Sequence, residues 1–257
     1  MSWRSFSLVV PLFNEEERVG ESGPALADFI AGYPAGSELI LVDDGSDDAT
    51  VAVARRLMAD RPEVPIRLLS RVHAGKGAAV RAGLDVATAE YAGFCDVDLS
   101  TPLDQFEHVV TAAFLSPSLA IGSRDAALSH LVRPESPLRE LLGKTYNRLV
   151  QLRLTPGVRD TQCGAKAAAT EVWRSILPWC QEEGFAWDVE AVALARCLGF
   201  PVREVAVAWS HDDRSRVRVG RDGFEMVRAV PRIARHLHRV PAGVGAGQPL
   251  ARTAGKH

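Results

Sequence analysis

Two aspartates with one residue between them, Asp96 and Asp98, follow a short apolar run from Tyr91 to Cys95. Such a run predicts a buried strand, and alternate side chains of a strand point the same way, so both carboxylates can reach one point just beyond it. Two carboxylate oxygens at that point suit Mg²⁺ or Mn²⁺, and such an ion usually shares its coordination shell with substrate phosphates. Taken alone, the Asp-x-Asp spacing is common, and a solvated turn in which Pro102 opens the next helix also explains it.

Apolar runs and helical stretches alternate on both sides of this pair, and this order predicts an α/β domain with a mainly parallel sheet. We expect strands at 7–13, 38–42, 66–69, 91–95 and 119–122. Helices are expected between them, to about Gly32, Asp60, Ala89 and Leu115, and Asn14 is expected to cap the first of these.

Each predicted strand ends in polar residues, and ligands of parallel sheets bind outside the carboxyl ends of the strands. A nucleotide-diphosphate sugar would use such groups: Asp43 could accept hydrogen bonds from the base or ribose, and a metal on Asp96 and Asp98 would neutralise the diphosphate. Lys76 and Arg124 would add positive charge. The clusters at these ends are Asn14/Glu15, Asp43/Asp44, His73/Lys76, Asp96/Asp98 and Ser123/Arg124.

Two phosphate-binding motifs are excluded. The first strand runs into Pro-Leu-Phe-Asn-Glu at 11–15, where a dinucleotide-binding fold would carry Gly-x-Gly-x-x-Gly. Gly75-Lys76-Gly77 has no Ser or Thr after the lysine, so it is not a Walker A loop.

The composition is that of a soluble globular protein, with 257 residues, 47% hydrophobic residues and a formal net charge of -2. This charge gives no indication of a nucleic-acid partner. The four cysteines show no metal-site spacing and are expected to be free thiols. Neither a signal peptide nor a transmembrane run is expected, which predicts a cytoplasmic protein, with a peripheral position at the inner face of the membrane as a further possibility.

Three stretches together resemble a family 2 glycosyltransferase of the GT-A fold. They are Val10-Pro11-Leu12-Phe13-Asn14-Glu15-Glu16, Leu41-Val42-Asp43-Asp44-Gly45-Ser46-Asp47-Asp48-Ala49-Thr50 and Asp96-Val97-Asp98. Gly75-Lys76-Gly77, Gly122-Ser123-Arg124, the string from Arg159 to Lys166 and Trp187-Asp188-Val189-Glu190 are similar to the dolichyl-phosphate β-glucosyltransferase and polyprenyl-phosphate glycosyltransferase branch. The resemblance covers roughly Leu8 to Val219 and implies a mixed, mainly parallel sheet flanked by helices.

The resemblance also implies roles by position. Asp98 would be the principal metal ligand with Asp96 beside it at the diphosphate, and Arg124 would lie near the sugar or the acceptor phosphate. Residues implied to hold the nucleotide or donor are Pro11, Phe13, Asn14, Glu15, Asp43, Asp44, Lys76, Asp96 and Arg216. Two positions depart from the pattern: Ser100 stands where polyprenyl-phosphate mannosyltransferases often carry a Gln metal ligand, and Ala165 where the branch usually has Phe. Cys163 is interpreted as a packed small residue and not as a nucleophile.

The acceptor side is expected in the second half of the chain. Residues 125–142, with Pro134 and Pro137, are predicted to form a loop over the site, and Arg133 and Arg139 are candidates for binding an acceptor phosphate, because arginine suits phosphate oxygens. Helices are expected at 144–154, 170–177 and 186–198 and a strand at 202–209. Asp188 is the candidate catalytic base for a hydroxyl acceptor; Glu190, on the same helix, is as readily a surface acid.

Three parts are expected along the chain: a glycosyltransferase domain at 1–221, a basic amphipathic helix at 222–240 interrupted at Pro231, and a disordered tail at 241–257. From Gly199 onward eleven Lys and Arg stand against five Asp and Glu. The apolar stripe of the helix suits the protein core, and its basic side suits an anionic bilayer surface.

The sequence thus predicts a metal-dependent inverting hexosyltransferase that uses Mg²⁺ or Mn²⁺, with Asp98, Asp188 and Arg124 at the catalytic centre. Glucose is the first choice of sugar and mannose the second, and the expected acceptor is a polyprenyl phosphate of the dolichyl or undecaprenyl type. Two alternatives stay open. One is a soluble enzyme that glycosylates a hydroxyl of a small metabolite, and the other is a non-catalytic protein that binds sugar nucleotides.

Overall fold

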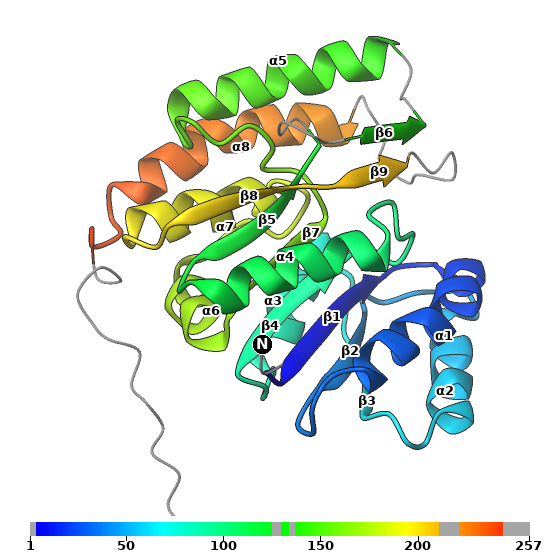
Figure 1. Ribbon diagram of the computed structural model, residues 1–257. Helices are drawn as coiled ribbons and strands as arrows, with labels where there is room; N and C mark the ends of the chain where they lie inside the picture. Colours follow the sequence, from blue (N-terminus) through cyan, green and yellow to red (C-terminus); the bar gives the residue numbers. More distant parts are fainter. Residues whose placement is uncertain (1–3, 125–129, 134–136, 211–220, 244–257) are drawn as a thin grey trace, which may run out of the picture.

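The computed structural model describes residues 4–124, 130–133, 137–210 and 221–243, and within 130–133, 137–142 and at Arg221 it describes the backbone only. Its centre is a seven-stranded sheet in the order β3-β2-β1-β4-β7-β5-β8 (Figure 1). The strands are β1 (Phe6–Leu12), β2 (Glu38–Asp43), β3 (Ile66–Ser70), β4 (Tyr91–Cys95), β5 (Leu119–Ser123), β7 (Ala165–Ala169) and β8 (Val202–Ala206).

All neighbouring strands of this sheet pair in parallel except β7, which runs antiparallel to both β4 and β5. The predicted mixed, mainly parallel sheet is therefore confirmed. Strand β7 was not among the predicted elements, because its sequence Ala-Lys-Ala-Ala-Ala contains none of the β-branched or aromatic residues that favour strands. Its small side chains are buried between two neighbours, so tertiary packing outweighs local propensity.

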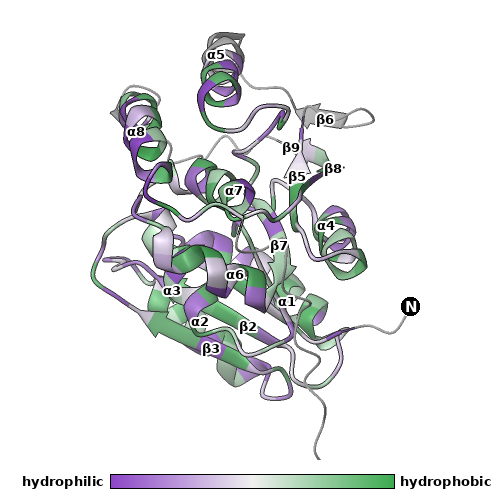
Figure 2. Ribbon diagram, turned by 90° about the vertical axis from the view of Figure 1, so that its left-hand side faces the viewer, coloured by the Kyte–Doolittle hydropathy of each residue, from purple (hydrophilic) through white to green (hydrophobic). Residues whose placement is uncertain are grey.

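Helices cover both faces of the sheet. On one face lie α1 (Glu16–Ala31), α2 (Thr50–Asp60) and α4 (Leu103–Leu115), packed on the even-numbered residues of β1. On the other lie α3 (Lys76–Asp85), α6 (Thr170–Ile176) and α7 (Trp187–Cys197), with the short 3-10 helix η1 (Leu177–Trp179) between the last two. Figure 2 shows apolar residues concentrated in the strands, whereas the helices carry both apolar and polar sides. The sequences of such strands are apolar throughout, because helices cover both faces of the sheet.

Two further helices extend this second layer. Helix α5 (Pro137–Arg153) and helix α8 (Arg221–Leu237) lie side by side and pack against α7 through Val150, Val189 and Val230 (Figures 1 and 2). A separate two-stranded ladder joins β6 (His130–Arg133) to β9 (Ala208–Ser210). No helix in the described part of the chain is long and apolar enough to cross a membrane.

Four predicted details are wrong. The stretch 125–142 contains β6 and the start of α5, so it is not one continuous loop, and the strand expected at 202–209 is divided between β8 and β9. Pro231 lies inside α8 without interrupting it, since buried Ala229, Val230 and Ile233 anchor the helix on both sides of the proline. Asn14 does not cap α1; it adopts a left-handed backbone conformation with φ of 55°, and its side chain accepts a hydrogen bond from the Asp47 amide at 2.8 Å.

Candidate active site

A cavity of about 1330 Å³ opens at the carboxyl ends of β1, β2, β3 and β4, where their polar termini meet. Its opposite side is formed by the segment 181–186 and by one side of α8. The structure therefore gathers most of the predicted donor residues around one space. Those that line it are Pro11, Phe13, Asn14, Glu15, Asp44, Lys76, Asp96 and Asp98. Asp43, Arg124 and Asp188 do not line it.

A tight turn after β4 presents Asp96 and Asp98 to the cavity. The Asp96 carbonyl accepts a hydrogen bond from Leu99 at 3.2 Å, and the Asp98 carboxylate accepts one from the Ser100 amide at 2.9 Å. Leu99 has a φ of 48°, a left-handed conformation that is uncommon for a branched residue and costs of order 1 kcal/mol. The strained residue Leu99 therefore lies in the turn that directs the two carboxylates toward the cavity.

The carboxylate ligands available at this turn fit a divalent cation. Asp96 and Asp98 supply hard oxygen ligands on the cavity wall, and no cluster of three or more metal-binding side chains occurs among the described residues. Mg²⁺ and Mn²⁺ commonly bind through one or two carboxylates and complete their shell with water and substrate phosphates. Gly164 leaves room for one ligand, because a Cβ atom there would lie 1.9 Å from Asp96 Oδ2. Asp96 and Asp98 would therefore hold such an ion together with a donor diphosphate.

Lys76, the first residue of α3, places a positive charge beside this turn. Its ammonium nitrogen lies 2.8 Å and 3.1 Å from the two oxygens of Asp96, and 3.5 Å from Asp188 Oδ2. Burial alone would lower the pKa of Lys76, but Asp188 and Asp96 raise it above its ordinary value. Burial in turn raises the pKa of Asp96, and the Lys76 charge opposes that rise. Lys76 is thus a permanent cation at the cavity wall.

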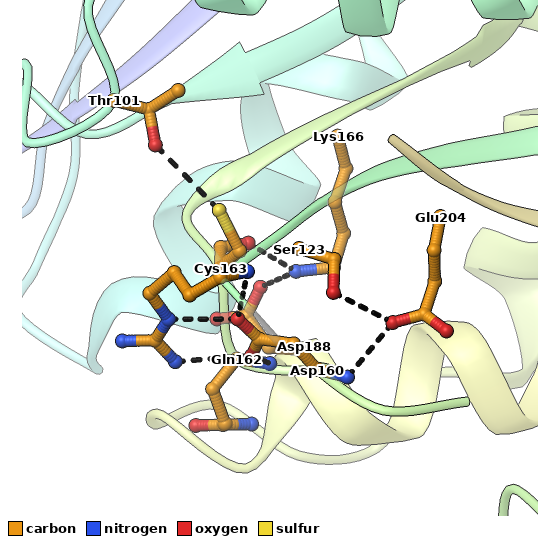
Figure 3. A network of polar contacts seen from close by, with 9 residues as sticks. Thr101, Ser123, Asp160, Gln162, Cys163, Lys166, Asp188 and Glu204 are labelled. Carbon is orange, nitrogen blue, oxygen red and sulfur yellow. Dashed lines mark hydrogen bonds and ion pairs between the residues drawn. The ribbon is translucent and has the colours of Figure 1, made fainter. Parts of the chain in front are cut away.

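Asp188, near the start of α7, lies behind Lys76 with 3% of its surface exposed. Its Oδ1 lies 2.5 Å from the ammonium of Lys166, a fully buried lysine on β7 that also donates to the Cys163 carbonyl at 2.7 Å. Figure 3 shows Lys166 and Asp188 directed at one another. Both oxygens of Asp188 therefore face lysines, and its role as a base stays a prediction.

Arg124 follows β5 and is held from two sides. Its guanidinium binds Asp160 through two parallel hydrogen bonds of 2.7 Å and 3.0 Å, and it lies over the Trp209 ring at 5.2 Å. Glu204 helps to fix the position of Asp160, because its carboxylate accepts hydrogen bonds from Ser123 and from the Asp160 amide (Figure 3). Burial would raise the pKa of Asp160, but the Arg124 charge holds it below its ordinary value.

Asp43, the last residue of β2, and Asp44, which follows it, organise one side of the cavity. Asp44 accepts hydrogen bonds from the amides of Ala74 and Gly75 and binds His73 Nδ1 at 2.8 Å, so it shapes the loop that leads to Lys76. Asp43 accepts from the Ser46 amide at 3.1 Å. The His73 ring stacks on Phe13 with ring centres 4.1 Å apart. These two rings form a flat, half-exposed surface on the cavity wall.

The far wall is built around Glu190. Its carboxylate accepts hydrogen bonds from the amides of Gln181 and Glu182, and burial raises its pKa. Glu182 in turn receives two hydrogen bonds from Arg232, of 3.0 Å and 2.8 Å, which tie α8 to the segment 181–186. Glu190 is therefore a buried structural acid and not the helix-surface acid that the sequence equally allowed.

Some predicted residues lie outside what the structure describes. The side chains of Arg133 and Arg139 and the whole of Arg216 fall in this class. The described cysteines are free, as expected. Burial raises the pKa of Cys163 to about 11, which agrees with its interpretation as a packing residue.

Four residues that shape the site had no predicted role of their own: His73, Asp160, Gly164 and Lys166. His73 belongs to a noted polar cluster, and the other three belong to the string from Arg159 to Lys166 that carried the resemblance. A basic residue within an otherwise alanine-only strand was the available signal for Lys166, because a buried lysine requires an acidic partner.

Comparisons with known proteins agree with this geometry. Residues 7–174 match the family model described as glycosyl transferase family 2. A dolichyl-phosphate beta-glucosyltransferase of Dictyostelium discoideum is 31% identical over 242 residues, covering 88% of this chain and 73% of the relative. The enzyme of the same name from Drosophila melanogaster is 33% identical over 237 residues, covering 85% and 73%.

Solved structures show the same fold. Glucosyl-3-phosphoglycerate synthase from Mycobacterium tuberculosis, in complex with Mn²⁺, uridine diphosphate and glucosyl-3-phosphoglycerate, superposes with a TM-score of 0.66 at 19% sequence identity. The match covers 90% of this chain and 80% of that one. The predicted GT-A fold is therefore confirmed.

Proposed function

The chain belongs to glycosyl transferase family 2, and from this premise we propose that it transfers glucose from a nucleotide-diphosphate sugar to a polyprenyl phosphate of the dolichyl or undecaprenyl type, with inversion at the sugar and release of the nucleotide diphosphate. The observation that carries the proposal is the meeting of Lys76, Asp96 and Asp98 on the wall of one cavity. The name of the relatives, dolichyl-phosphate beta-glucosyltransferase, supports both the sugar and the acceptor. Mannose is the second choice of sugar.

The donor occupies the part of the cavity beside β1 to β4. The nucleotide lies along Pro11, Phe13, Glu15 and Asp44, with Asp43 next to this wall, and its diphosphate lies at Lys76 and Asp96. A solved structure of the same fold that holds Mn²⁺ and uridine diphosphate supports uridine as the nucleoside of the donor. A divalent ion held by Asp96 and Asp98 would stabilise the charge that develops on the departing diphosphate.

The acceptor determines whether a base is needed. A phosphate oxygen is already ionised near neutral pH, so positioning and charge stabilisation supply most of the rate. Arg124 approaches the acceptor or sugar from β5, where Asp160 fixes its guanidinium. A hydroxyl acceptor would require proton removal. Asp188 lies behind Lys76, which favours the phosphate acceptor over the hydroxyl.

The outer side of α8 suits a membrane-borne acceptor. Phe224 and Val227 are 60% and 46% exposed, and the Arg228 guanidinium lies over the Phe224 ring at 5.2 Å. Arg235 and Arg239 are exposed farther along the same segment. Apolar side chains flanked by arginines favour contact with an anionic bilayer surface. We therefore propose a peripheral position at the inner face of the membrane.

The decisive experiment measures transfer from a panel of radiolabelled nucleotide sugars, with and without Mn²⁺ and a short polyprenyl phosphate. We expect Mn²⁺-dependent glucose transfer from UDP-glucose to the polyprenyl phosphate. Transfer only to small hydroxylated metabolites would establish the alternative enzyme instead. Binding of UDP-glucose without transfer or hydrolysis would indicate a non-catalytic binding protein.

A further inference from the structure

Asp188 is a buried carboxylate with a lysine at each oxygen. Lys166 lies 2.5 Å from Oδ1 and Lys76 lies 3.5 Å from Oδ2. A general base must come within hydrogen-bond reach of the proton that it removes. Lys76 lines the cavity whereas Asp188 does not, so the lysine separates this carboxylate from any acceptor bound there.

Lys166 fixes Asp188 to the sheet. Its side chain is fully buried, its ammonium donates to the Cys163 carbonyl at 2.7 Å, and it lies over the Phe94 ring at 5.2 Å. A buried charge without a partner is strongly destabilising, so Lys166 and Asp188 require each other. Because Lys166 belongs to a central strand, the carboxylate that it binds has a fixed position.

Lys76 depends on this fixed position. Lysine has a flexible four-carbon side chain and no intrinsic geometry at its charged end. Here the ammonium lies between Asp96, at 2.8 Å, and Asp188, at 3.5 Å, and it stands 5.8 Å from the centre of the Phe94 ring. Two carboxylates on separate elements therefore define where the Lys76 charge stands.

We propose that Asp188 is a positioning residue: with Lys166 it holds the Lys76 ammonium beside Asp96, at the place where the donor diphosphate lies. The inference rests on the proposed function for the role of Lys76, and it replaces proton removal as the role of Asp188. It predicts that Asp188 acts on the reaction only through Lys76.

The first test needs no substrate. Amine acylation of the intact, substrate-free protein, quantified at Lys76 by mass spectrometry, compares wild type with Asp188→Asn. We expect faster labelling of Lys76 in the variant, because one of its two anchors is lost, while exposed Lys144 labels at the same rate in both. Equal labelling of Lys76 in the two proteins would overturn the inference, whatever the substrate proves to be.

The second test is a double-mutant cycle on glucose transfer with Asp188→Asn and Lys76→Met. Loss of the Lys76 charge lowers kcat by about 100-fold, and its misplacement in Asp188→Asn lowers kcat by roughly 10-fold. The double variant should match Lys76→Met within about twofold, because Asp188 has nothing left to position. If the two kcat losses multiply in the double variant, Asp188 acts independently of Lys76 and the inference is overturned. Loss of one limb of the pH–rate profile in Asp188→Asn would identify Asp188 as a base and would also overturn it.

Asp188→Asn leaves Lys166 buried without an anion, so folding needs its own control. The variant Lys166→Met/Asp188→Asn removes both charges, and such replacements are often neutral for stability. We expect it to melt close to wild type and still show the kcat loss and the faster Lys76 labelling. Wild-type labelling and kcat in this folded variant would contradict the proposed role. Absence of transfer in the wild type would refute the proposed function alone, since the labelling result is independent of it.

Discussion

Gly164 stands directly against the carboxylate of Asp96. A Cβ atom at Gly164 would lie 1.9 Å from Asp96 Oδ2 and 2.5 Å from its Cγ, closer than any real contact. The Asp96 amide also donates to the Gly164 carbonyl at 3.2 Å, so the two backbones are joined. Glycine is therefore needed here for space, and the carboxylate cannot keep its position if a side chain is added.

Gly164→Ala should displace Asp96 and lower transfer by about 100-fold, as a misplacement of about 1 Å does at an active site. Mn²⁺ titrations of turnover should show weaker metal activation. Gly143→Ala is the matched control, because a Cβ there meets nothing within 4 Å, and it should leave transfer unchanged. Wild-type activation by Mn²⁺ in Gly164→Ala would show that Asp96 has no part in holding the metal.

Asp98→Ala should remove the principal carboxylate ligand and lower metal-dependent turnover by roughly 100-fold. Mn²⁺ binding in the presence of UDP, followed by electron paramagnetic resonance, should weaken in parallel. Asp60→Ala changes an exposed aspartate at the end of α2 and should alter neither quantity. An Asp98→Ala protein that binds Mn²⁺ as wild type does would refute the metal assignment.

His73→Ala should weaken UDP binding by about 2- to 10-fold, because the stacked ring pair contributes on the order of 1 kcal/mol. Phe13 would lose its partner at 4.1 Å, and the flat surface on the nucleotide side would be incomplete. Calorimetry with UDP and with inorganic pyrophosphate separates base contacts from phosphate contacts. Only UDP binding should change; an equal loss for pyrophosphate would place His73 at the phosphates instead.

Asp160→Asn should change how folding stability depends on pH. The Arg124 charge keeps the pKa of Asp160 below its ordinary value despite burial, so its contribution is complete above the unfolded pKa of about 3.9 and is lost as pH falls through the lower folded value. The free energy of unfolding, measured with urea at pH 7, should be roughly 3 kcal/mol higher for wild type than for Asp160→Asn. This difference should shrink below about pH 4. A difference that stays constant down to about pH 2 would contradict the ion pair.

The double variant Phe224→Ser/Val227→Ser should bind less to vesicles that contain phosphatidylglycerol. Loss of two apolar side chains from the bilayer contact should lower the partition coefficient by about 10-fold or more. Leu115→Ser, which removes an apolar residue that is 59% exposed at the end of α4, serves as the control in the same flotation assay. Unchanged flotation of the double variant would mean that α8 is not the membrane-binding surface.

The features that depend on local order could be predicted from the sequence. The apolar runs of β1, β2 and β4 are visible directly, since a strand covered on both faces is apolar throughout. The polar residues that follow these strands had to meet at one rim, because parallel strands end on the same side. For this reason the sequence alone assigns Asp96, Asp98 and Lys76 to one rim of the sheet.

Only the tertiary structure decided what surrounds these residues. Strand β7 has no strand-forming residues of its own, and it forms because β4 and β5 enclose it. Its burial brings Lys166 to Asp188, the segment before it brings Gly164 to Asp96, and β5 brings Arg124 to Asp160. These contacts join residues 22 to 68 positions apart, and neither periodicity nor local spacing encodes them. The two ion pairs form because packing buries Lys166, Asp188 and Asp160 away from water, and each buried charge must then find its partner within the fold. The contact of Gly164 with Asp96 arises because packing leaves no space for a side chain there.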